Sequence, residues 1–325
     1  MSLLEVNNLT IYYEKEQSVV KAVNGISFKL AEGETMGLVG ETGAGKTTTA
    51  LGMMNLVPNP PGKIKSGEVL VDGKNVLTMS KKELSRFHGN QAAMIFQDPM
   101  TSLNPIMTVG NQIAETIRHH EKLSRADAYK SAEKMLETVG IDSDRMSDYP
   151  HQFSGGMKQR VVIAIALACN PRLLLADEPT TALDVTIQAQ ILDLMNDLKK
   201  KYSMGMLMIT HDLGVVAEMC QRVSIMYAGR LVESGDLEDV FDRPSHPYTR
   251  GLLSSLPSLN EDMERLRPIP GMMPDPANLP AGCPFCPRCE QRMEICQDTM
   301  PGNMEVSNGH FTMCHLYSSN KGGTT

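Results

Sequence analysis

The sequence has no apolar run long enough to cross a membrane. Its longest run, from Val161 to Cys169, has nine residues, whereas a membrane-spanning helix needs about 20. The first residues, Met1-Ser2-Leu3-Leu4-Glu5, also lack the basic and apolar regions of a secretory leader. We therefore expect a cytoplasmic protein that reaches a membrane only through a partner.

Positive charge is also scarce. The 31 Lys and Arg residues are outnumbered by 38 Asp and Glu residues, which gives a net charge of -7, and no block of basic residues occurs. Because an acidic surface repels phosphate backbones, nucleic acid is not an expected partner. The 325 residues suffice for one large domain with a smaller appendage, and the 41% hydrophobic content is ordinary for a globular protein.

The seven cysteines are unevenly distributed. Cys169 and Cys220 stand alone in apolar segments, where they are interpreted as small core residues. The other five lie between Cys283 and Cys314. In a cytosolic chain such a cluster favours metal binding over disulfides.

Short apolar strands alternate with helical patterns along most of the chain, which predicts a parallel sheet covered by helices. Charged helical segments at about 98–155 form an insertion. Near Pro244 the composition shifts to Pro, Gly, Met and Cys with weak periodicity, which marks a domain boundary. Strands are expected at 3–13, 25–30, 36–39, 94–96, 172–176, 206–209 and 222–227, and residues 67–76 carry a turn at Asp72-Gly73. Helices are expected at 47–56, 108–140 (two, joined near 123–124), after 154, at 185–201 and at 213–220.

A glycine-rich loop follows the expected strand 36–39. Residues 40–47 read Gly-Glu-Thr-Gly-Ala-Gly-Lys-Thr, which matches G-x-x-x-x-G-K-[ST] in full, and a helix is expected next. Glycines let the backbone turn its N–H groups toward an anion, and the helix N-terminus adds positive dipole. Lys46 is placed to reach the β- and γ-phosphates and Thr47 to bind Mg²⁺. The loop predicts a nucleoside-triphosphate site, which many families share.

Two further motifs narrow the choice. The expected strand 172–176 ends in Asp177 and Glu178, a pair that can hold Mg²⁺ and polarise an attacking water. Upstream, residues 153–160 read Phe-Ser-Gly-Gly-Met-Lys-Gln-Arg, and Ser154 is a natural N-cap for the helix that follows. The start of this helix is therefore a second candidate anion site.

In this order the motifs resemble those of ABC-transporter ATPases, from about Leu3 to Arg250. The family's signature loop usually reads Leu-Ser-Gly-Gly-Gln, and here Phe153 and Met157 replace the first and last residues. The resemblance implies an α/β P-loop NTPase of the ABC ATPase type, with an antiparallel β subdomain and a helical subdomain at about 98–155. It implies an ATPase domain at 1–243 and a small, irregular, Cys-rich extension at 244–325.

The resemblance also assigns roles to single residues. Gln97 resembles the glutamine that senses Mg²⁺ and the membrane subunits, His211 the histidine that contacts the γ-phosphate, and residues 181–184 the loop that crosses to the partner ATPase. Tyr13 matches the aromatic residue that stacks on adenine, with Tyr12 as an alternative. Of these and the motif residues, Thr47 and Gln97 are expected to bind Mg²⁺, and Glu178, His211 and Gln97 are expected to be catalytic. The residues expected to bind ATP are Tyr13, Gly40, Glu41, Thr42, Gly43, Ala44, Gly45, Lys46, Thr47, Thr48, Gln97, Asp177, Ser154, Gly155, Gly156 and Met157.

The closest likeness is to the oligopeptide/dipeptide importer branch, through residues 97–105, 246–253 and 279–283. Family members pair two ATPase domains head to tail, so that one chain with one phosphate loop and one signature loop needs a second ATPase subunit. Met157 is typical of the first of two different paired subunits, which implies a heterodimer. The resemblance further implies two permease subunits, an extracytoplasmic substrate-binding protein and a peripheral location on the cytoplasmic face of the membrane.

Other functions stay open at this point. The same branch also contains nickel and metallophore importers. An exporter ATPase is disfavoured by the importer-like tail. A soluble ABC ATPase that acts on ribosomes or DNA is disfavoured by the single ATPase domain and the acidic charge.

The tail cysteines follow the pattern Cys283-x2-Cys286-x2-Cys289-x6-Cys296-x17-Cys314. Soft thiolates suit an iron–sulfur cluster or zinc, and free thiols in a loose tail are the alternative. The tail of the importer branch resembles this segment but has no cysteine at the place of Cys286, and members with that tail bind a [4Fe–4S] cluster. The resemblance therefore implies Cys283, Cys289, Cys296 and Cys314 as ligands of a structural [4Fe–4S] cluster, with Cys286 as a spare and zinc as the alternative.

Overall fold

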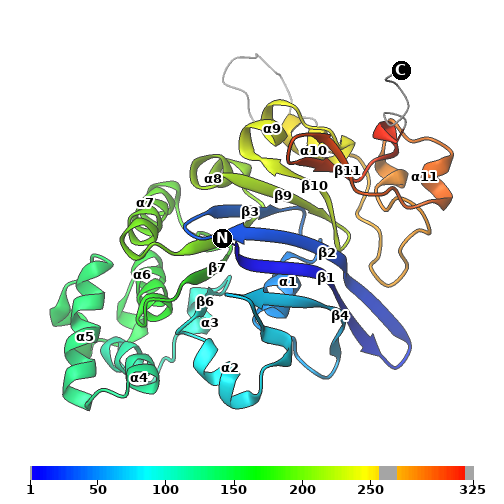
Figure 1. Ribbon diagram of the computed structural model, residues 1–325. Coiled ribbons are helices and arrows are strands. Elements are labelled where there is room, and N and C mark those ends of the chain that lie inside the picture. The colour runs from blue at the N-terminus through cyan, green and yellow to red at the C-terminus, as the bar shows by residue number, and fades with distance from the viewer. Residues whose placement is uncertain (1, 256–268, 319–325) are drawn as a thin grey trace. The chain divides into compact units, whose positions relative to one another are not determined.

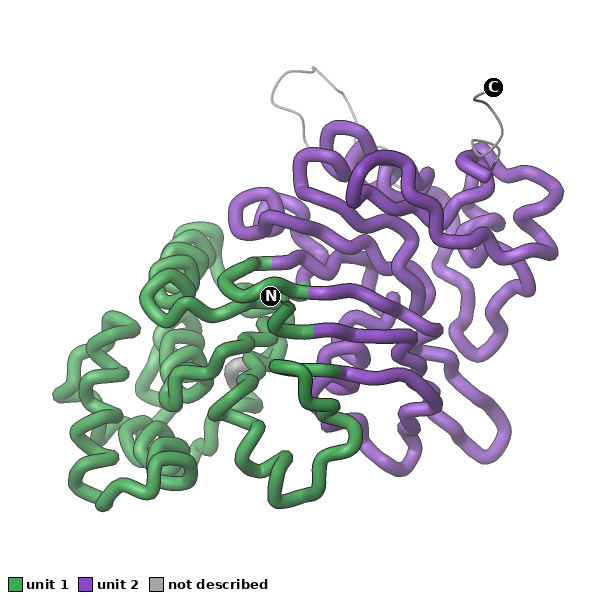
Figure 2. Tube along the Cα trace, in the orientation of Figure 1, with its two compact units in different colours: residues 1–4, 30–35, 70–209 green, residues 5–29, 36–69, 210–325 purple. Residues whose placement is uncertain are grey.

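The computed structural model describes residues 2–255 and 269–318, apart from the side chains of residues 99 and 100. Figure 1 labels its helices and strands. The chain divides into two compact units, of residues 1–4, 30–35 and 70–209 (unit 1) and of residues 5–29, 36–69 and 210–325 (unit 2) (Figure 2). Each unit therefore combines segments that are far apart in the sequence.

Three parallel strands carry unit 1. They are β6 (Ala92–Ile95), β7 (Leu173–Asp177) and β8 (Gly205–Thr210), with β7 between the other two. All residues of β7 and β8 are buried, as expected for parallel strands that are covered on both faces. The predicted strands are confirmed, and β7 delivers Asp177 to its carboxyl end.

In the helical insertion of unit 1, capping residues mark where the helices begin and end. Lys122 adopts a left-handed conformation (φ 52°) after α4 (Val109–Glu121), and Ser124 then caps α5 (Arg125–Thr138). The predicted break near 123–124 is thus confirmed. The other helices of unit 1 are α2 (Lys81–Phe87), α3 (Pro99–Ser102), α6 (Gly155–Leu167) and α7 (Val185–Tyr202).

In unit 2, β3 (Thr35–Val39) runs parallel to β9 (Arg222–Tyr227), and β9 is antiparallel to β10 (Arg230–Asp236). The β-rich N-terminal part contains β1 (Ser2–Lys15), β2 (Ser18–Ala31) and β4 (Gly62–Val71), in the order β2-β1-β4. The boundary between the units passes through these three strands. The helices of unit 2 before the tail are α1 (Lys46–Met53), α8 (Leu213–Met219) and α9 (Leu237–Asp242).

A predicted turn follows β4. Asp72 (φ 49°) and Gly73 (φ 73°) are both left-handed, and the short β5 (Lys74–Asn75) returns antiparallel to the end of β4. Two successive positive φ angles are the geometry of a two-residue hairpin turn, for which Asp-Gly is favoured.

The tail is more regular than its weak periodicity predicts. Residues 247–254 form helix α10 (Pro247–Ser254), and the strands β11 (Met304–Ser307) and β12 (His310–Thr312) form a hairpin whose second strand pairs with β10. Strands of three or four residues are too short to show periodicity, which explains why the sequence did not reveal them. The remaining short elements are α11 (Ile295–Asp298) and 3₁₀ turns at 76–78, 143–147, 150–152, 286–288 and 315–317.

No helix within 2–255 and 269–318 combines the length and the apolar character that a membrane span requires.

Candidate nucleotide-hydrolysis site

The phosphate loop of unit 2 joins the buried strand β3 to helix α1. Gly43 (φ 86°) and Gly45 (φ 105°) adopt left-handed conformations that glycine tolerates best. A Cβ atom at Gly40 would lie only 2.1 Å from the carbonyl oxygen of Met226. The glycines are therefore needed both for the turn of the loop and for its close packing on the end of β9.

Lys46 is held above this loop. Its side chain is largely buried, with 6% of the residue exposed, and its Nζ donates hydrogen bonds to the carbonyl oxygens of Gly40 (2.7 Å) and Glu41 (3.2 Å). Thr42, Gly43 and Thr47 are exposed. The loop thus presents accessible residues around an ammonium group, at the start of a helix whose dipole favours anions.

Tyr13 lies beside the same helix. Its hydroxyl oxygen is 3.5 Å from Oγ1 of Thr48, and the residue is half-buried. Neighbouring side chains of a strand point to opposite faces, so that Tyr12 of β1 points away from this position. Of the two tyrosines that the sequence offered, Tyr13 is the one near the phosphate loop.

The carboxylates of unit 1 lie at the carboxyl end of β7. Asp177, the last residue of the strand, is 1% exposed, and Glu178 follows it in a half-buried position. Oε2 of Glu178 accepts hydrogen bonds from Nε2 of Gln97 (2.9 Å) and from Oγ1 of Thr181 (2.8 Å). Two donors on one oxygen fix the direction of the carboxylate, and a carboxylate held in one orientation can polarise a water within hydrogen-bond reach.

The backbone at Glu178 is strained. Its φ angle of 46° is unusual for a residue with a side chain, and Ala182 repeats this conformation with a φ of 64°. The Glu178 N–H donates to the carbonyl oxygen of Ile209 (2.8 Å), and the Glu178 carbonyl accepts from the N–H of Thr181 (3.2 Å). Such strain persists only where the surroundings hold it, and it is concentrated at functional sites.

The signature segment opens helix α6. Ser154 is the N-cap, and its Oγ accepts the N–H of Met157 at 3.4 Å. A Cβ atom at Gly156 would lie 2.5 Å from Cγ2 of Ile187 on α7, so that glycine permits close packing of the two helices. Ser154 and Gly155 are exposed. The segment therefore keeps an open helix N-terminus.

Arg145 contacts both residues in which this segment departs from the usual signature. Its guanidinium carbon lies 4.4 Å from the ring centroid of Phe153, and its Nη1 is 3.5 Å from Sδ of Met157. Nη2 also donates to the carbonyl oxygen of Gln152 (3.1 Å). Sequence reasoning missed Arg145, because nothing in its local pattern distinguishes it from an exposed arginine.

His211 follows β8 and is exposed. The next residue, Asp212, caps helix α8 by accepting the N–H of Gly214 at 2.8 Å. Unit 2 thus contains Tyr13, the phosphate loop and His211. Unit 1 contains Gln97, the Asp177–Glu178 pair and the signature segment.

The five tail cysteines line one cavity in unit 2. All are buried except Cys289, which is half-buried, and the N–H of Cys283 donates to the carbonyl oxygen of Cys296 (2.9 Å). Burial, with a smaller contribution from the neighbouring Cys296 and Cys314, raises the pKa of the Cys283 thiol to about 11. Cys286, which the sequence left as a spare, lines the same cavity as the others.

Across residues 2–255 and 269–318, no group of three or more His, Cys, Asp or Glu side chains is arranged to hold a metal ion. The predicted ligand set therefore stays a prediction. The chemistry of the cavity fits it nonetheless, because soft thiolates are the ligands that iron–sulfur clusters and zinc prefer.

Comparisons with known proteins match two regions of the chain. Residues 23–181 match the family model described as ABC transporter, and residues 232–296 match that of the oligopeptide/dipeptide transporter, C-terminal region. The chain is 51% identical to the oligopeptide transport ATP-binding protein OppD of Bacillus subtilis (strain 168), over 97% of this chain and 88% of that protein. It is 47% identical to the dipeptide transport ATP-binding protein DppD of the same organism, over 97% and 94%.

Solved structures give the same picture of the fold. The dimeric structure of MJ0796, a bacterial ABC transporter cassette, is similar with a TM-score of 0.64 and 28% identity, over 72% of this chain and 98% of that one. The structure of cbiO1 from Clostridium perfringens, part of the ABC transporter complex cbiONQ, has a TM-score of 0.64 and 27% identity, over 74% and 91%.

Proposed function

Since the chain belongs to the ATP-hydrolysing subunits of the ABC transporter family, we propose that it powers the import of short peptides through a membrane transporter. The oriented carboxylate of Glu178 is the main structural support, because hydrolysis needs a base that is fixed before the water arrives. The names of the relatives favour peptides over nickel or metallophores as cargo.

The proposal assigns a role to each of the predicted site residues. Lys46 and the N–H groups of the phosphate loop bind the β- and γ-phosphates, while Tyr13 stacks on the adenine. Thr47, Gln97 and Asp177 are the residues that would hold Mg²⁺, which would neutralise phosphate charge when bound. Glu178 polarises the attacking water. The remaining assignments are the contact of His211 with the γ-phosphate and the orienting role of Gln97 toward Glu178.

A partner ATPase is part of the proposal. One chain supplies one phosphate loop and one signature segment, so that its exposed Ser154 and Gly155 would cover the ATP of a second subunit. Val185, directly after the Thr181–Asp184 loop, is 85% exposed, which suits an apolar contact with such a partner. The similar MJ0796 cassette is itself described as dimeric. Following the interpretation of Met157, we propose a heterodimer.

The permease contact is proposed near Gln97. Phe96 is 42% exposed and Ile106 is 82% exposed, on either side of helix α3. Exposed apolar side chains in the segment that contains Gln97 would let the membrane subunits sense hydrolysis. We accordingly place the chain on the cytoplasmic face of the membrane, with an ATPase domain at 1–243 and an extension at 244–325.

Reconstitution tests the function. The chain, its partner ATPase, the permease subunits and the binding protein are placed in proteoliposomes, and ATP binding, ATP turnover and peptide uptake are measured. Glu178→Gln should keep ATP binding but lose most of its turnover and uptake, whereas Lys46→Ala should weaken binding itself. Glu218→Gln, which removes an exposed carboxylate of α8, is the matched control. Near-normal turnover in Glu178→Gln would refute the assigned role.

For the tail we propose a [4Fe–4S] cluster with Cys283, Cys289, Cys296 and Cys314 as ligands. Support comes from the thiols of these four residues, which line one cavity together with Cys286. When bound, the cluster would cross-link three segments of the tail. The cysteine-bearing segments themselves contain little regular structure, so that this link would supply much of their stability.

Iron content tests the cluster independently of ATPase activity. Anaerobic purification should give a brown protein with broad absorbance and about four irons per chain. Cys296→Ser should lose the iron and Cys286→Ser should keep it. A colourless protein with one zinc would refute the cluster, and the opposite result for the two serine variants would show that the ligand choice is wrong.

A further inference from the structure

A buried arginine of the tail contacts the phosphate loop. Arg288 lies in the 3₁₀ turn Cys286–Arg288, and only 6% of its side chain is exposed. Its Nη1 donates to Oε2 of Glu41, the second residue of the phosphate loop, at 2.8 Å. The same Nη1 is 3.4 Å from the hydroxyl of Tyr227. A residue of the cysteine-bearing tail is therefore an ion-pair partner of the loop.

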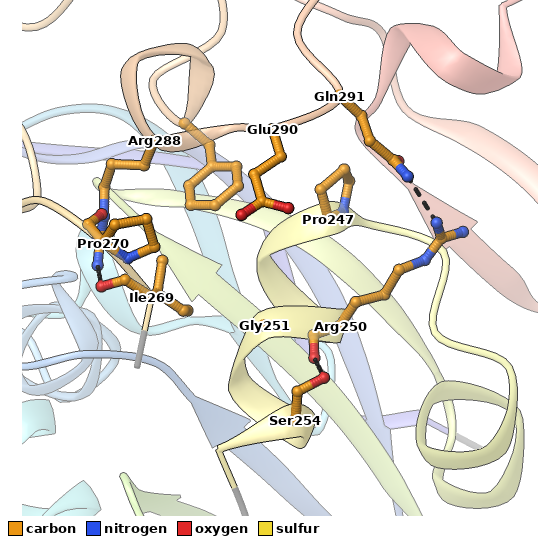
Figure 3. Close-up of a pocket in the computed structure, with 10 residues that line it drawn as sticks. Pro247, Arg250, Gly251, Ser254, Ile269, Pro270, Arg288, Glu290 and Gln291 are labelled. Carbon is orange, nitrogen blue, oxygen red and sulfur yellow. Dashed lines mark hydrogen bonds between the residues drawn. The ribbon is translucent and has the colours of Figure 1, made fainter. Parts of the chain in front are cut away.

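The guanidinium of Arg288 is fixed by the backbone as well. Its Nε donates to the carbonyl oxygen of Pro270 (2.9 Å) and its Nη2 to that of Ile269 (3.3 Å). Figure 3 shows Arg288 beside these two residues, at the edge of a cavity that Arg250 and Gly251 of α10 border on another side. With every nitrogen engaged, the guanidinium cannot turn away from Glu41 without breaking other hydrogen bonds.

The backbone of Glu41 has a second anchor. Its N–H donates to the hydroxyl of Tyr248 at 3.0 Å, and Tyr248, from α10, is fully buried. The rings of Tyr227, Tyr248 and Phe285 pack together, with centroid distances of 4.6 to 5.4 Å. Both the main chain and the side chain of Glu41 are thus attached to the C-terminal part of the protein.

The carboxylate of Glu41 would disfavour the binding of an anion to the loop. The loop is built to bind a triphosphate, and an uncompensated negative charge in it would repel the ligand. The Glu41 side chain is 29% exposed, so that water screens its charge only in part. The buried guanidinium of Arg288 supplies the compensating charge from outside the motif.

We propose that Arg288 is a positioning residue for ATP binding: it neutralises Glu41 and, together with Tyr248, holds the second residue of the phosphate loop in place. ATP affinity then depends on the order of the tail turn that contains Arg288. The inference rests on the proposed ATPase function and adds to it a residue outside the sequence motifs of the ATPase domain.

ATP binding to the purified full-length chain tests the proposal, with KM and kcat measured on the assembled transporter. Arg288→Ala should weaken ATP binding about tenfold, the size expected for a lost buried charge-assisted contact. KM should rise while kcat changes little, because Glu178 is untouched. Arg288→Lys should be intermediate, since lysine keeps the charge but not the fork of donors.

The double variant Glu41→Gln/Arg288→Ala separates electrostatics from packing. Its affinity should return to within about threefold of wild type, because the repelling carboxylate is gone. Raising the salt concentration should reduce the difference in ATP affinity between wild type and Arg288→Ala. Tyr248→Phe keeps the ring packing and should weaken binding about threefold. Arg292→Ala removes an exposed arginine four residues away and should bind ATP like wild type.

The outcomes distinguish a failure of the proposed ATPase function from a failure of the proposed role of Arg288. If wild type binds no ATP, the proposed function fails and this inference falls with it. If wild type binds ATP and Arg288→Ala binds it equally well, only the inference is overturned. A double variant as weak as Arg288→Ala would also overturn it, because a purely structural role predicts that result. If Arg288→Ala does not fold, Arg288→Lys and Tyr248→Phe decide by the same criterion.

Discussion

At the scale of single residues, Glu178 depends on two donors of different origin. Gln97 comes from the segment after β6, whereas Thr181 lies only three residues beyond Glu178. The family resemblance indicated Gln97. It gave Thr181 a role only as part of the loop toward a partner, whereas the hydrogen bond makes it an orienting group within its own chain.

Thr181→Val tests this second donor. The variant keeps the shape of the side chain but removes the hydroxyl, so that Oε2 of Glu178 retains only one of the two contacts. We expect turnover to fall about tenfold with little change in KM, since a misplaced base affects the chemical step. Thr181→Ser, which keeps the hydroxyl, should stay near wild type. Equal kinetics for Thr181→Val and wild type would contradict the orienting role.

His246 is a buried group whose charge state affects stability. Complete burial, with a smaller contribution from Arg250, lowers the pKa of His246 from 6.5 to about 3. Its Nδ1 accepts the N–H of Tyr248 and so caps α10 in the neutral form. Below about pH 6.5, His246 binds a proton in the unfolded chain but stays neutral in the folded chain. The contribution of His246 to the unfolding free energy is therefore complete above this pH and declines as the pH falls toward 3.

His246→Asn removes this titration and can still accept the capping hydrogen bond. Between pH 7 and pH 5, wild type should lose about 2 kcal/mol more unfolding free energy than the variant. Denaturant unfolding at the two pH values gives this difference. His151→Asn, at an exposed site, is the control and should follow wild type. The same pH dependence in wild type and His246→Asn would argue against a neutral buried imidazole.

At the scale of elements, the terminal hairpin is attached to the ATPase core through a buried pair. His310 of β12 places its Nε2 2.7 Å from Oε1 of Glu233 on β10, and Glu233 is 1% exposed. The carboxylate also accepts the N–H groups of Ser245 (2.6 Å) and His246 (2.8 Å). One carboxylate therefore joins β10, β12 and the start of α10.

His310→Ala should destabilise the protein by about 2 to 3 kcal/mol, because it leaves a buried carboxylate with one partner fewer. His310→Gln should lose less unfolding free energy, since the glutamine amide can donate to the same oxygen. Thermal unfolding of the two variants provides the comparison. An unchanged midpoint in His310→Ala would show that β12 is held by its backbone pairing alone.

At the scale of the whole molecule, the arrangement of motifs predicts an incomplete enzyme. The exposed signature segment and the exposed Val185 suit a partner rather than solvent. We expect the purified chain to be monomeric or weakly associated, with little ATPase activity, and to gain activity when the partner ATPase and permeases are added. Sedimentation and steady-state turnover measure both. A stable, fully active homodimer at low concentration would contradict the heterodimer.

The sequence by itself determined the elements that carry strong local signals. The phosphate loop, the Asp177–Glu178 pair and the helix capped by Ser154 were all predicted, because glycine patterns, apolar runs and capping residues act within about a turn of the chain. The order of these motifs indicated the family, and the comparisons confirmed it. The tail was predicted poorly, since β11 and β12 are too short for a periodic signal.

Only the tertiary structure decided which side chains meet across long stretches of sequence. Nothing local relates Arg288 to Glu41, 247 residues away, or Arg145 to Phe153 and Met157. Of the two tyrosines that the sequence offered, Tyr13 has its hydroxyl oxygen 3.5 Å from Oγ1 of Thr48, a contact that no local pattern predicts. Local patterns report the conformation of a segment, but the pairing of buried charges depends on how distant segments pack, which a single sequence does not encode in any short window.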